Sequence, residues 1–208
     1  MKSPASLLLA LVVALAGAAL PAQAASRNAA QSAASLSAAE RADLSFMREE
    51  EKLARDVYLA LYERWGLTPF SNISASEQQH MDAILMLLRK YRLPDPAAGR
   101  LVGEFSDPDL QILHDTLLAR GLTGDVAALK VGGFIEETDI RDLDGALARA
   151  DNTDIDQVYA RLQCGSRNHL RAFARVLEAV SGQAYQAQVI DPLAVETILA
   201  GDNETCGR

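Results

Sequence analysis

The chain has 208 residues, of which 49% are hydrophobic and 23% charged, and its formal net charge is −8. This length and composition suit one globular domain with a real hydrophobic core. The acidic balance argues against nucleic acid as a partner, because phosphate binding depends on clustered Lys and Arg side chains. An acidic surface also attracts cations, although many such surfaces serve only solubility.

The first residues have the pattern of a secretory signal peptide. Lys2 supplies a positive charge, residues 7–20 form an apolar run, and Ala22 to Ala24 form a small-x-small cleavage site. The apolar run is short for a membrane span, which needs about 20 residues; an uncleaved anchor is the alternative. We therefore predict a signal peptide over residues 1–24, cut after Ala24, and a periplasmic or secreted protein with no stable membrane span after cleavage.

Beyond the signal peptide, the sequence divides into a leader and a helical domain. Residues 25–37 lack the large apolar side chains of a core and are expected to be flexible. Residues 38–208 form the predicted helical domain. Capping-box spacing occurs at Ser37, just before it, with Glu40, and at Ser74 with Glu77, and glycine or proline follows several segments, as at helix ends. The expected helices are 40–64, 74–91, 108–120, 125–150, 154–162 and 166–181, with a last short helix beginning at Asp191–Pro192.

The fold class follows from these segments. No part of the chain alternates polar and apolar residues with period two, and Ala and Leu dominate. Gly132 and Gly133 lie inside one long helix, which predicts close packing there. We expect an all-α four-helix bundle of the up-down type, built from helices 40–64, 74–91, 125–150 and 166–181, with extra short helices.

The two cysteines are Cys164 and Cys206. In an oxidising compartment an even pair is expected to form a disulfide, which would tie the C-terminal tail to the helix near position 164. Two free thiols are the alternative.

Each long helix carries an ionisable residue on its apolar stripe. Residues three, four and seven positions apart share a helix face, and a charge on a buried face is costly unless it is paired or bound to a metal ion. The residues in question are Glu51 in the first long helix, Glu77 and His80 in the second, Glu136 in the third and His169 in the fourth.

Each of these residues has an ordinary alternative. Glu77 would be only the acid of the second capping box, and Glu51 would belong to a solvated acidic run and pair with Arg55. Glu136 and Glu137 would form a solvated charged pair. The two histidines would make local hydrogen bonds.

The order of these residues resembles the plan of ferritin-like di-metal carboxylate proteins, in which two helices each give a Glu and two give Glu-x-x-His. More closely, the stretches FMREEEKLARDVY, SEQQHM, IEETDIRDL and GSRNHLRAF look like an uncharacterised ferritin-like family of domains of unknown function. The resemblance covers roughly residues 44–180. It implies a ferritin-like bundle in which metal ions are held in the core by Glu51, Glu77, His80, Glu136 and His169.

The fourth helix departs from this plan at Ser166, which stands three residues before His169 where a Glu is expected. Asp139, one turn after Glu136, or Glu137 would replace the missing carboxylate. Without a replacement, the site has five ligands and would hold one metal ion or an asymmetric pair.

Carboxylates and imidazoles without thiolate suit iron, manganese or zinc, and the resemblance makes iron the first expectation. Two irons imply oxidation of ferrous iron or reduction of oxygen or peroxide, with Tyr58, seven residues after Glu51, donating a hydrogen bond or an electron. The alternatives are a non-catalytic metal-handling protein of the cell envelope and a helical interaction module whose buried polar network holds no metal. The sequence leaves open whether the chain is an enzyme.

The surroundings of the site are predicted from spacing alone. We expect Arg55, Asp56 and Asn168 to support the ligands, and His114 to lie at the surface. The added short helices favour a monomer or dimer over a cage.

Overall fold

The computed structural model describes residues 36–207, which contain six α-helices and no strand. The signal peptide, its cleavage site and nearly all of the leader lie outside the described residues, so they stay predictions. The prediction of an all-α helical bundle is confirmed, and within the described part of the chain no helix is long and apolar enough to cross a membrane. The helices are α2 (Ala38–Trp65), α3 (Thr68–Lys90), α4 (Pro108–Gly121), α5 (Asp125–Arg149), α6 (Thr153–Ser181) and α7 (Pro192–Ala200).

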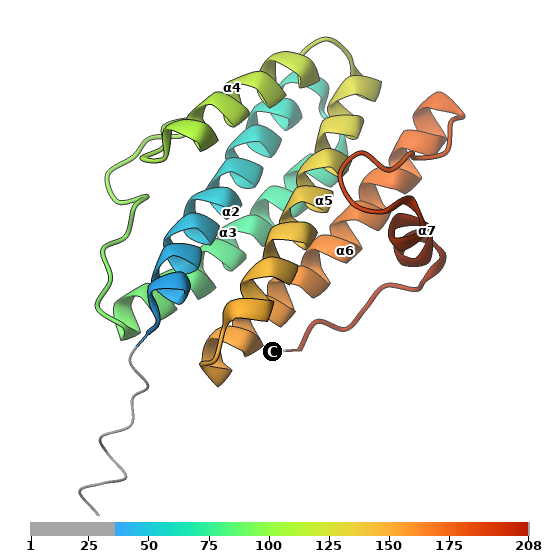
Figure 1. The fold of residues 1–208 in the computed structure, drawn as a ribbon. Coiled ribbons are helices and arrows are strands. Elements are labelled where there is room, and N and C mark those ends of the chain that lie inside the picture. Colours follow the sequence, from blue (N-terminus) through green and yellow to red (C-terminus); the bar gives the residue numbers. More distant parts are fainter. Residues whose placement is uncertain (1–35, 208) are drawn as a thin grey trace, which may run out of the picture. The chain divides into compact units, whose positions relative to one another are not determined.

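Four long helices form a ring in which each packs against two neighbours (Figure 1). Both α2 and α6 pack against α3 and α5. Neighbours are antiparallel: Arg149 at the end of α5 pairs with Asp43 near the start of α2, Lys90 at the end of α3 pairs with Asp154 near the start of α6, and short loops join the other two pairs.

The connection between α3 and α5 differs from the expected up-down order. These two helices run in the same direction, so the chain must return along the length of the bundle between them (Figure 1). The returning segment contains α4, which packs against α2 and α5. The bundle therefore has one long crossover connection, and α4 in this connection covers a side of α2 that α3 and α5 leave open.

Several helix boundaries agree with the capping signals. Ser37 Oγ accepts a hydrogen bond from Glu40 N at 3.1 Å, and the Glu40 side chain accepts one from Ser37 N at 2.8 Å. Gly66 ends α2 with a left-handed φ of 66°. Asp107 and Asp191 cap α4 and α7 by accepting bonds from N–H groups of the first turn.

Two predicted helix starts are wrong. Ser74 lies inside α3, which already begins at Thr68 with a proline in its first turn, and its hydroxyl donates to a carbonyl one turn earlier. Ser166 lies inside α6, which runs without a break from Thr153. Because Ser74 caps nothing, Glu77 is not the acid of a capping box and faces the interior instead.

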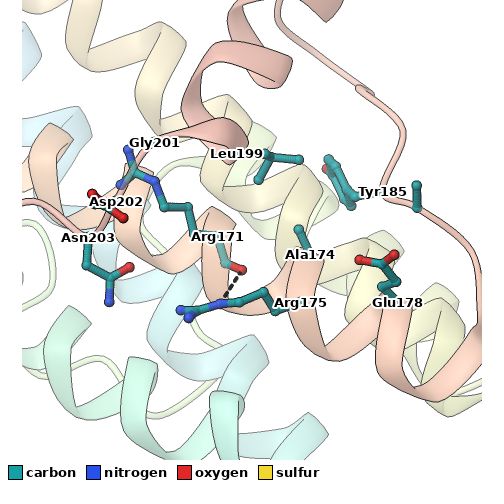
Figure 2. A pocket seen from close by; sticks show the side chains of 10 residues that line it. Arg171, Ala174, Arg175, Glu178, Tyr185, Leu199, Gly201, Asp202 and Asn203 are labelled. Atoms are coloured by element: carbon teal, nitrogen blue, oxygen red, sulfur yellow. Dashed lines mark hydrogen bonds between the residues drawn. The ribbon is translucent and has the colours of Figure 1, made fainter.

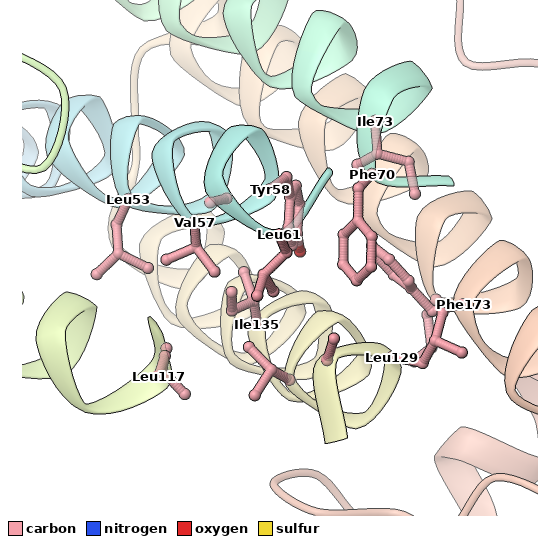
Figure 3. Packing of buried hydrophobic residues seen from close by; sticks show 14 of the residues in the cluster. Leu53, Val57, Tyr58, Leu61, Phe70, Ile73, Leu117, Leu129, Ile135 and Phe173 are labelled. Atoms are coloured by element: carbon pink, nitrogen blue, oxygen red, sulfur yellow. The ribbon is translucent and has the colours of Figure 1, made fainter. Parts of the chain in front are cut away.

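The core contains a group of aromatic rings at one end of the bundle (Figure 3). The ring centroid of Tyr58 lies 5.9 Å from that of Phe70 and 5.2 Å from that of Phe173. A side chain added at Gly132 would overlap the Phe173 ring, and one at Gly133 would overlap a tyrosine ring of the C-terminal segment. The predicted close packing at both glycines is therefore confirmed.

The C-terminal tail is held against α6. Cys164 and Cys206 form the expected disulfide, and Arg167 and Arg171 pair with Glu204 at 2.5 Å and 2.9 Å. A buried disulfide is typical of an oxidising, extracellular compartment.

Glu40 ties the start of α2 to the turn between α5 and α6. Its buried carboxylate accepts bonds from the N–H groups of Asp151 and Asn152 and from the Asn152 amide. We expect Glu40→Ala to lower the free energy of unfolding by about 3 kcal/mol, because each hydrogen bond to a charged group contributes about 1.5–3 kcal/mol.

The same contacts make this contribution depend on pH. Burial alone would raise the pKa of Glu40, but the hydrogen bonds from Asn152, Ser37 and Asp151 outweigh it and lower the pKa from 4.5 to about 2. The stabilisation is therefore complete above pH 4.5 and is lost as the pH falls toward 2. Urea unfolding should show a smaller difference between wild type and variant at pH 3 than at pH 7; an equal difference would contradict this role.

Candidate metal centre

Residues from all four long helices meet in the middle of the bundle. Glu51 comes from α2, Glu77 and His80 from α3, Glu136 from α5, and His169 from α6. They form two groups whose ligand atoms lie within 4.8 Å of one another: Glu51 with Glu77 and His80, and Glu136 with Glu77 and His169. The five residues singled out in the sequence therefore lie together, and Glu77 belongs to both groups.

Glu77 lies between the two imidazole rings. His80 Nδ1 is 2.7 Å from Glu77 Oε2 and 3.2 Å from Glu51 Oε2. His169 Nδ1 is 2.9 Å from Glu77 Oε1 and 3.4 Å from Glu136 Oε2. The rings are stacked with centroids 5.6 Å apart. Glu77 therefore turns one carboxylate oxygen toward each imidazole and belongs to both groups.

Several potential ligand atoms are buried without a hydrogen-bond partner. Glu51 Oε1 and Asp139 Oδ1 face no donor, while Glu77 Oε1 and His169 Nδ1 lie 2.9 Å apart as an ion pair without hydrogen-bond geometry. Among residues 36–207, the candidate carboxylates form ion pairs with the two histidines and with no Lys or Arg. Buried carboxylates are costly unless a cation neutralises them, so the residues present fit a site for metal ions.

The crowding of charges shifts the pKa values of these groups. Burial and the charge of Asp139 raise the pKa of Glu51 well above its usual range. Burial, with the charges of nearby glutamates, raises the pKa of Asp139 to about 7. Burial lowers the pKa of both imidazoles, but the facing carboxylates outweigh it and raise the pKa of His169 to about 10 and that of His80 well above its usual value. The metal-free centre therefore holds protons at neutral pH.

Tyr58 borders the centre and is fully buried. Its hydroxyl donates to Glu136 Oε1 at 2.6 Å, and its ring packs against Phe70 and Phe173 (Figure 3). Burial and the negative charge of Glu136 raise the pKa of the phenol well above its usual value. Tyr58 is thus held as a neutral donor beside a candidate ligand.

Asp139 lies where the fourth helix lacks its carboxylate. Ser166 donates its hydroxyl hydrogen to Asp139 Oδ2, while Asp139 Oδ1 stays free and lines the same small cavity as Glu51, Glu77 and Glu136. A carboxylate from α5 therefore reaches the position next to Ser166 on α6.

Glu137 lies away from the centre, which corrects its place among the candidate ligands. Its carboxylate accepts bonds from the N–H groups of residues 188–190 and, at 2.5 Å, from the hydroxyl of Tyr185. Successive residues of a helix point about 100° apart, so Glu136 and Glu137 face different sides. Glu137 fastens the C-terminal segment to α5.

The acidic run at residues 49–51 is not a solvated face, because Glu49, Glu50 and Glu51 are 3%, 4% and 1% exposed. Glu49 accepts bonds from the N–H groups of Ser106 at 2.6 Å and Asp107 at 3.0 Å, and so fixes the approach to α4. Neither oxygen of Glu50 has a hydrogen-bond partner. The crossover segment and α4 bury these three acids. The sequence around residues 49–51 does not indicate that another segment packs there.

Three residues near the centre were not found from the sequence: Glu50, Ser76 and Gly165. Glu50 shares a face with Leu53 and Val57, three and seven residues later, and that spacing was a usable signal. Ser76 Oγ lies 3.0 Å from Nε2 of a candidate ligand, His169. The roles of Ser76 and Gly165 depend on how α3 meets α6, which the sequence does not indicate.

Gly165 makes room for His80. A Cβ atom at this position would lie 2.7 Å from His80 Nε2 and 2.8 Å from Cε1. We expect Gly165→Ala to displace the imidazole and to weaken metal binding by at least about tenfold, the size of effect seen when groups that orient a ligand are changed. Titration with Co²⁺ measures the affinity. Gly145→Ala is the control, because its Cβ would meet only the flexible end of Arg149; equal affinities of the two variants would contradict this role for Gly165.

The residues predicted to support the ligands serve other parts of the fold. Arg55 and Asp56 bind each other, and Asp56 also holds the segment before α4. Asn168 binds the C-terminal tail. His114 was expected at the surface but is 6% exposed, with its ring against Phe105.

The centre lies apart from the larger cavities. A cavity of about 470 Å³ lies between α6 and the C-terminal tail and is lined by Arg171, Arg175, Glu178 and Tyr185 among others (Figure 2). It contains no candidate ligand, and Arg171 is already engaged by the Ile198 carbonyl and a carboxylate. The cavity at the centre is only about 10 Å³, which is about the space of one water molecule.

Comparison with known proteins places the chain in a family. The model of an "Uncharacterized protein domain (DUF2202)" matches residues 40–202. Uncharacterized protein MJ0754 of Methanocaldococcus jannaschii is 47% identical over 169 residues, which are 81% of this chain and 91% of that protein. A crystal structure titled as hypothetical protein MJ0754 from Methanococcus jannaschii superposes with a TM-score of 0.79, covering 81% of this chain and 96% of that one. The chain therefore belongs to the DUF2202 family.

Proposed function

We propose that this protein binds two metal ions, iron first among them, in the centre formed by α2, α3, α5 and α6. The observation that carries the proposal is the position of Glu77, whose two oxygens are shared by two groups that each add one imidazole and one further carboxylate. Two divalent cations also carry the charge that balances four buried carboxylates. These four are Glu51, Glu77, Glu136 and Asp139.

We further propose that the domain is ferritin-like. The arrangement of four long helices with one long crossover connection is the topology that ferritin-like folds use, and the ligand pattern follows the same plan with Asp139 beside Ser166 in place of one Glu. Carboxylate and imidazole ligands suit iron, with manganese and zinc as the other candidates.

The activity we propose is oxidation of ferrous iron with reduction of oxygen or peroxide. Iron supplies the electrons when it is bound. The small cavity at the centre favours reactants as small as oxygen or peroxide. Tyr58 donates its hydroxyl hydrogen to Glu136 and so orients that carboxylate. The rings of Phe70 and Phe173 exclude water from the side of the centre next to Tyr58.

We also propose that the protein is exported, cut after Ala24, and acts in the periplasm or outside the cell as a monomer or dimer. The disulfide between Cys164 and Cys206 supports an oxidising compartment. The acidic balance of the chain supports cations as its partners.

An oxygen electrode tests the activity. Ferrous iron added to the metal-free protein should cause oxygen uptake above the rate of iron in buffer, and the double variant His80→Ala, His169→Ala should remove both this uptake and metal binding. Metal binding without oxygen uptake would replace the redox activity by a metal-handling role. Unchanged metal content in the double variant would overturn the site assignment.

A further inference from the structure

Glu50 is a buried carboxylate that the candidate ligand groups do not include. It is 4% exposed, and neither of its oxygens has a hydrogen-bond partner. No Lys or Arg in residues 36–207 pairs with it; the nearby Lys52 is taken up by Asp56 and a backbone carbonyl. An unpaired buried acid is expensive, so its retention points to a use that requires a free carboxylate.

Glu50 lies between two small cavities of about 10 Å³ each. The inner cavity is also lined by Glu51, Glu77, Glu136 and Asp139, and so belongs to the centre. The outer cavity lies under α4 and is lined by apolar residues of α2, α4 and α5 with Thr138. Among the described residues that line these cavities, Glu50 is the one carboxylate common to both. Each cavity has room for about one water-sized species.

A line of acids leads from Glu50 to the protein surface. Asp139 and Asp142 lie one turn apart on the same face of α5, and the charges of both act on Glu50, whose pKa is raised well above its usual range by burial and by these neighbours. The Asp142 side chain is 25% exposed and pairs with the half-exposed Arg141. A series of three acids therefore lies between the solvent and the centre: Asp142, Glu50 and Asp139.

We propose that Glu50 is a transfer carboxylate, which passes divalent cations from Asp142 at the surface to Asp139 and Glu51 in the centre. This inference rests on the proposed metal-binding function. Glu50 is suited to transfer rather than to permanent binding, because it lies outside both groups of close ligand atoms while its two oxygens remain free.

Stopped-flow mixing of the metal-free protein with Co²⁺ tests the proposal, because the visible absorption of the ion reports its ligation. We expect Glu50→Gln to slow binding by about tenfold or more, since carboxylates that line an entry path raise the rate of cation arrival by about 10–10³-fold. The final number of bound ions should stay that of the wild type. Asp142→Asn should also slow binding, and Asp144→Asn, an exposed acid two residues along α5, should not.

The outcomes separate the two proposals. Glu50→Gln keeps the side-chain shape and removes a buried acid whose ionisation is opposed by burial and by Asp139 and Asp142, so its unfolding midpoint should match or exceed that of the wild type. An unchanged rate in Glu50→Gln would overturn the transfer role, and a lower number of bound ions would make Glu50 a ligand instead. Failure of the wild type to bind Co²⁺ would overturn the metal-binding function and the transfer role with it.

Discussion

Replacing Glu77 by glutamine is expected to remove both metal ions from the centre and to lower metal affinity by at least about 100-fold. Changing a residue that only orients a ligand already lowers affinity by up to about 100-fold, and the loss of a ligand should cost at least as much. The reason is that Glu77 is the one residue shared by both groups, with Oε2 near His80 and Oε1 near His169. A glutamine has one oxygen and no negative charge, so it cannot serve both positions. Metal analysis after dialysis measures the loss.

Two single substitutions make this prediction specific. Glu51→Gln and Glu136→Gln each change one group only, and each variant should retain one of the two metal ions. Glu63→Gln is the control, because Glu63 is an exposed acid near the end of α2 and its loss should leave both ions in place. Two bound ions per chain in Glu77→Gln would show that the ions are held elsewhere.

The second large effect is a fall in metal affinity as the pH is lowered. The facing carboxylates raise the pKa of His169 to about 10, against the lowering effect of burial, and raise that of His80 well above its usual value. The carboxylates therefore favour the protonated form of both imidazoles in the metal-free protein, and each imidazole must lose a proton to bind a metal ion. Burial also raises the pKa of Asp139 to about 7, so this carboxylate is protonated on the acid side of neutrality. Affinity should fall by about tenfold per pH unit for each proton released, and at least two are released.

Calorimetric titration in buffers with different heats of ionisation counts these protons. The stability of the metal-free protein depends on the same protons. Each group with a raised pKa stabilises the metal-free fold more at low pH than at high pH, and this stabilisation is lost as the pH rises toward the pKa of the group in the folded protein. The difference in melting temperature between the metal-loaded and the metal-free protein should therefore grow from pH 6 to pH 8. Equal affinities at pH 6 and pH 8 would contradict the proton-linked centre.

Much of the bundle follows from local signals. The capping box at Ser37, the stop at Gly66 and the aspartate–proline starts at 107 and 191 all mark true helix ends, because each depends on contacts within a few residues. Ser74 and Ser166 carry the same kind of signal in helix interiors. There the long apolar stripe and tertiary packing outweigh a local preference.

The residues that meet in the candidate site could be predicted from the sequence, but their surroundings could not. Glu51, Glu77, His80, Glu136 and His169 all lie on apolar stripes, and the structure brings them together. Whether Asp139 or Glu137 joined them could not be decided, because that depends on the rotation of α5 against α6 and on a C-terminal segment that binds Glu137. Glu50 was overlooked because its neighbours suggested a solvated acidic run, whereas the crossover segment and α4 bury all three acids.

The metal content of the mature protein, purified without chelator and then supplied with ferrous iron under anaerobic conditions, tests the central claim most directly. The arrangement around Glu77 predicts two metal ions per chain, measured by mass spectrometry of the metal against protein concentration. One ion per chain would restrict the function to mononuclear metal handling. No bound ion would contradict the metal centre and leave the buried carboxylates and imidazoles as a structural polar network.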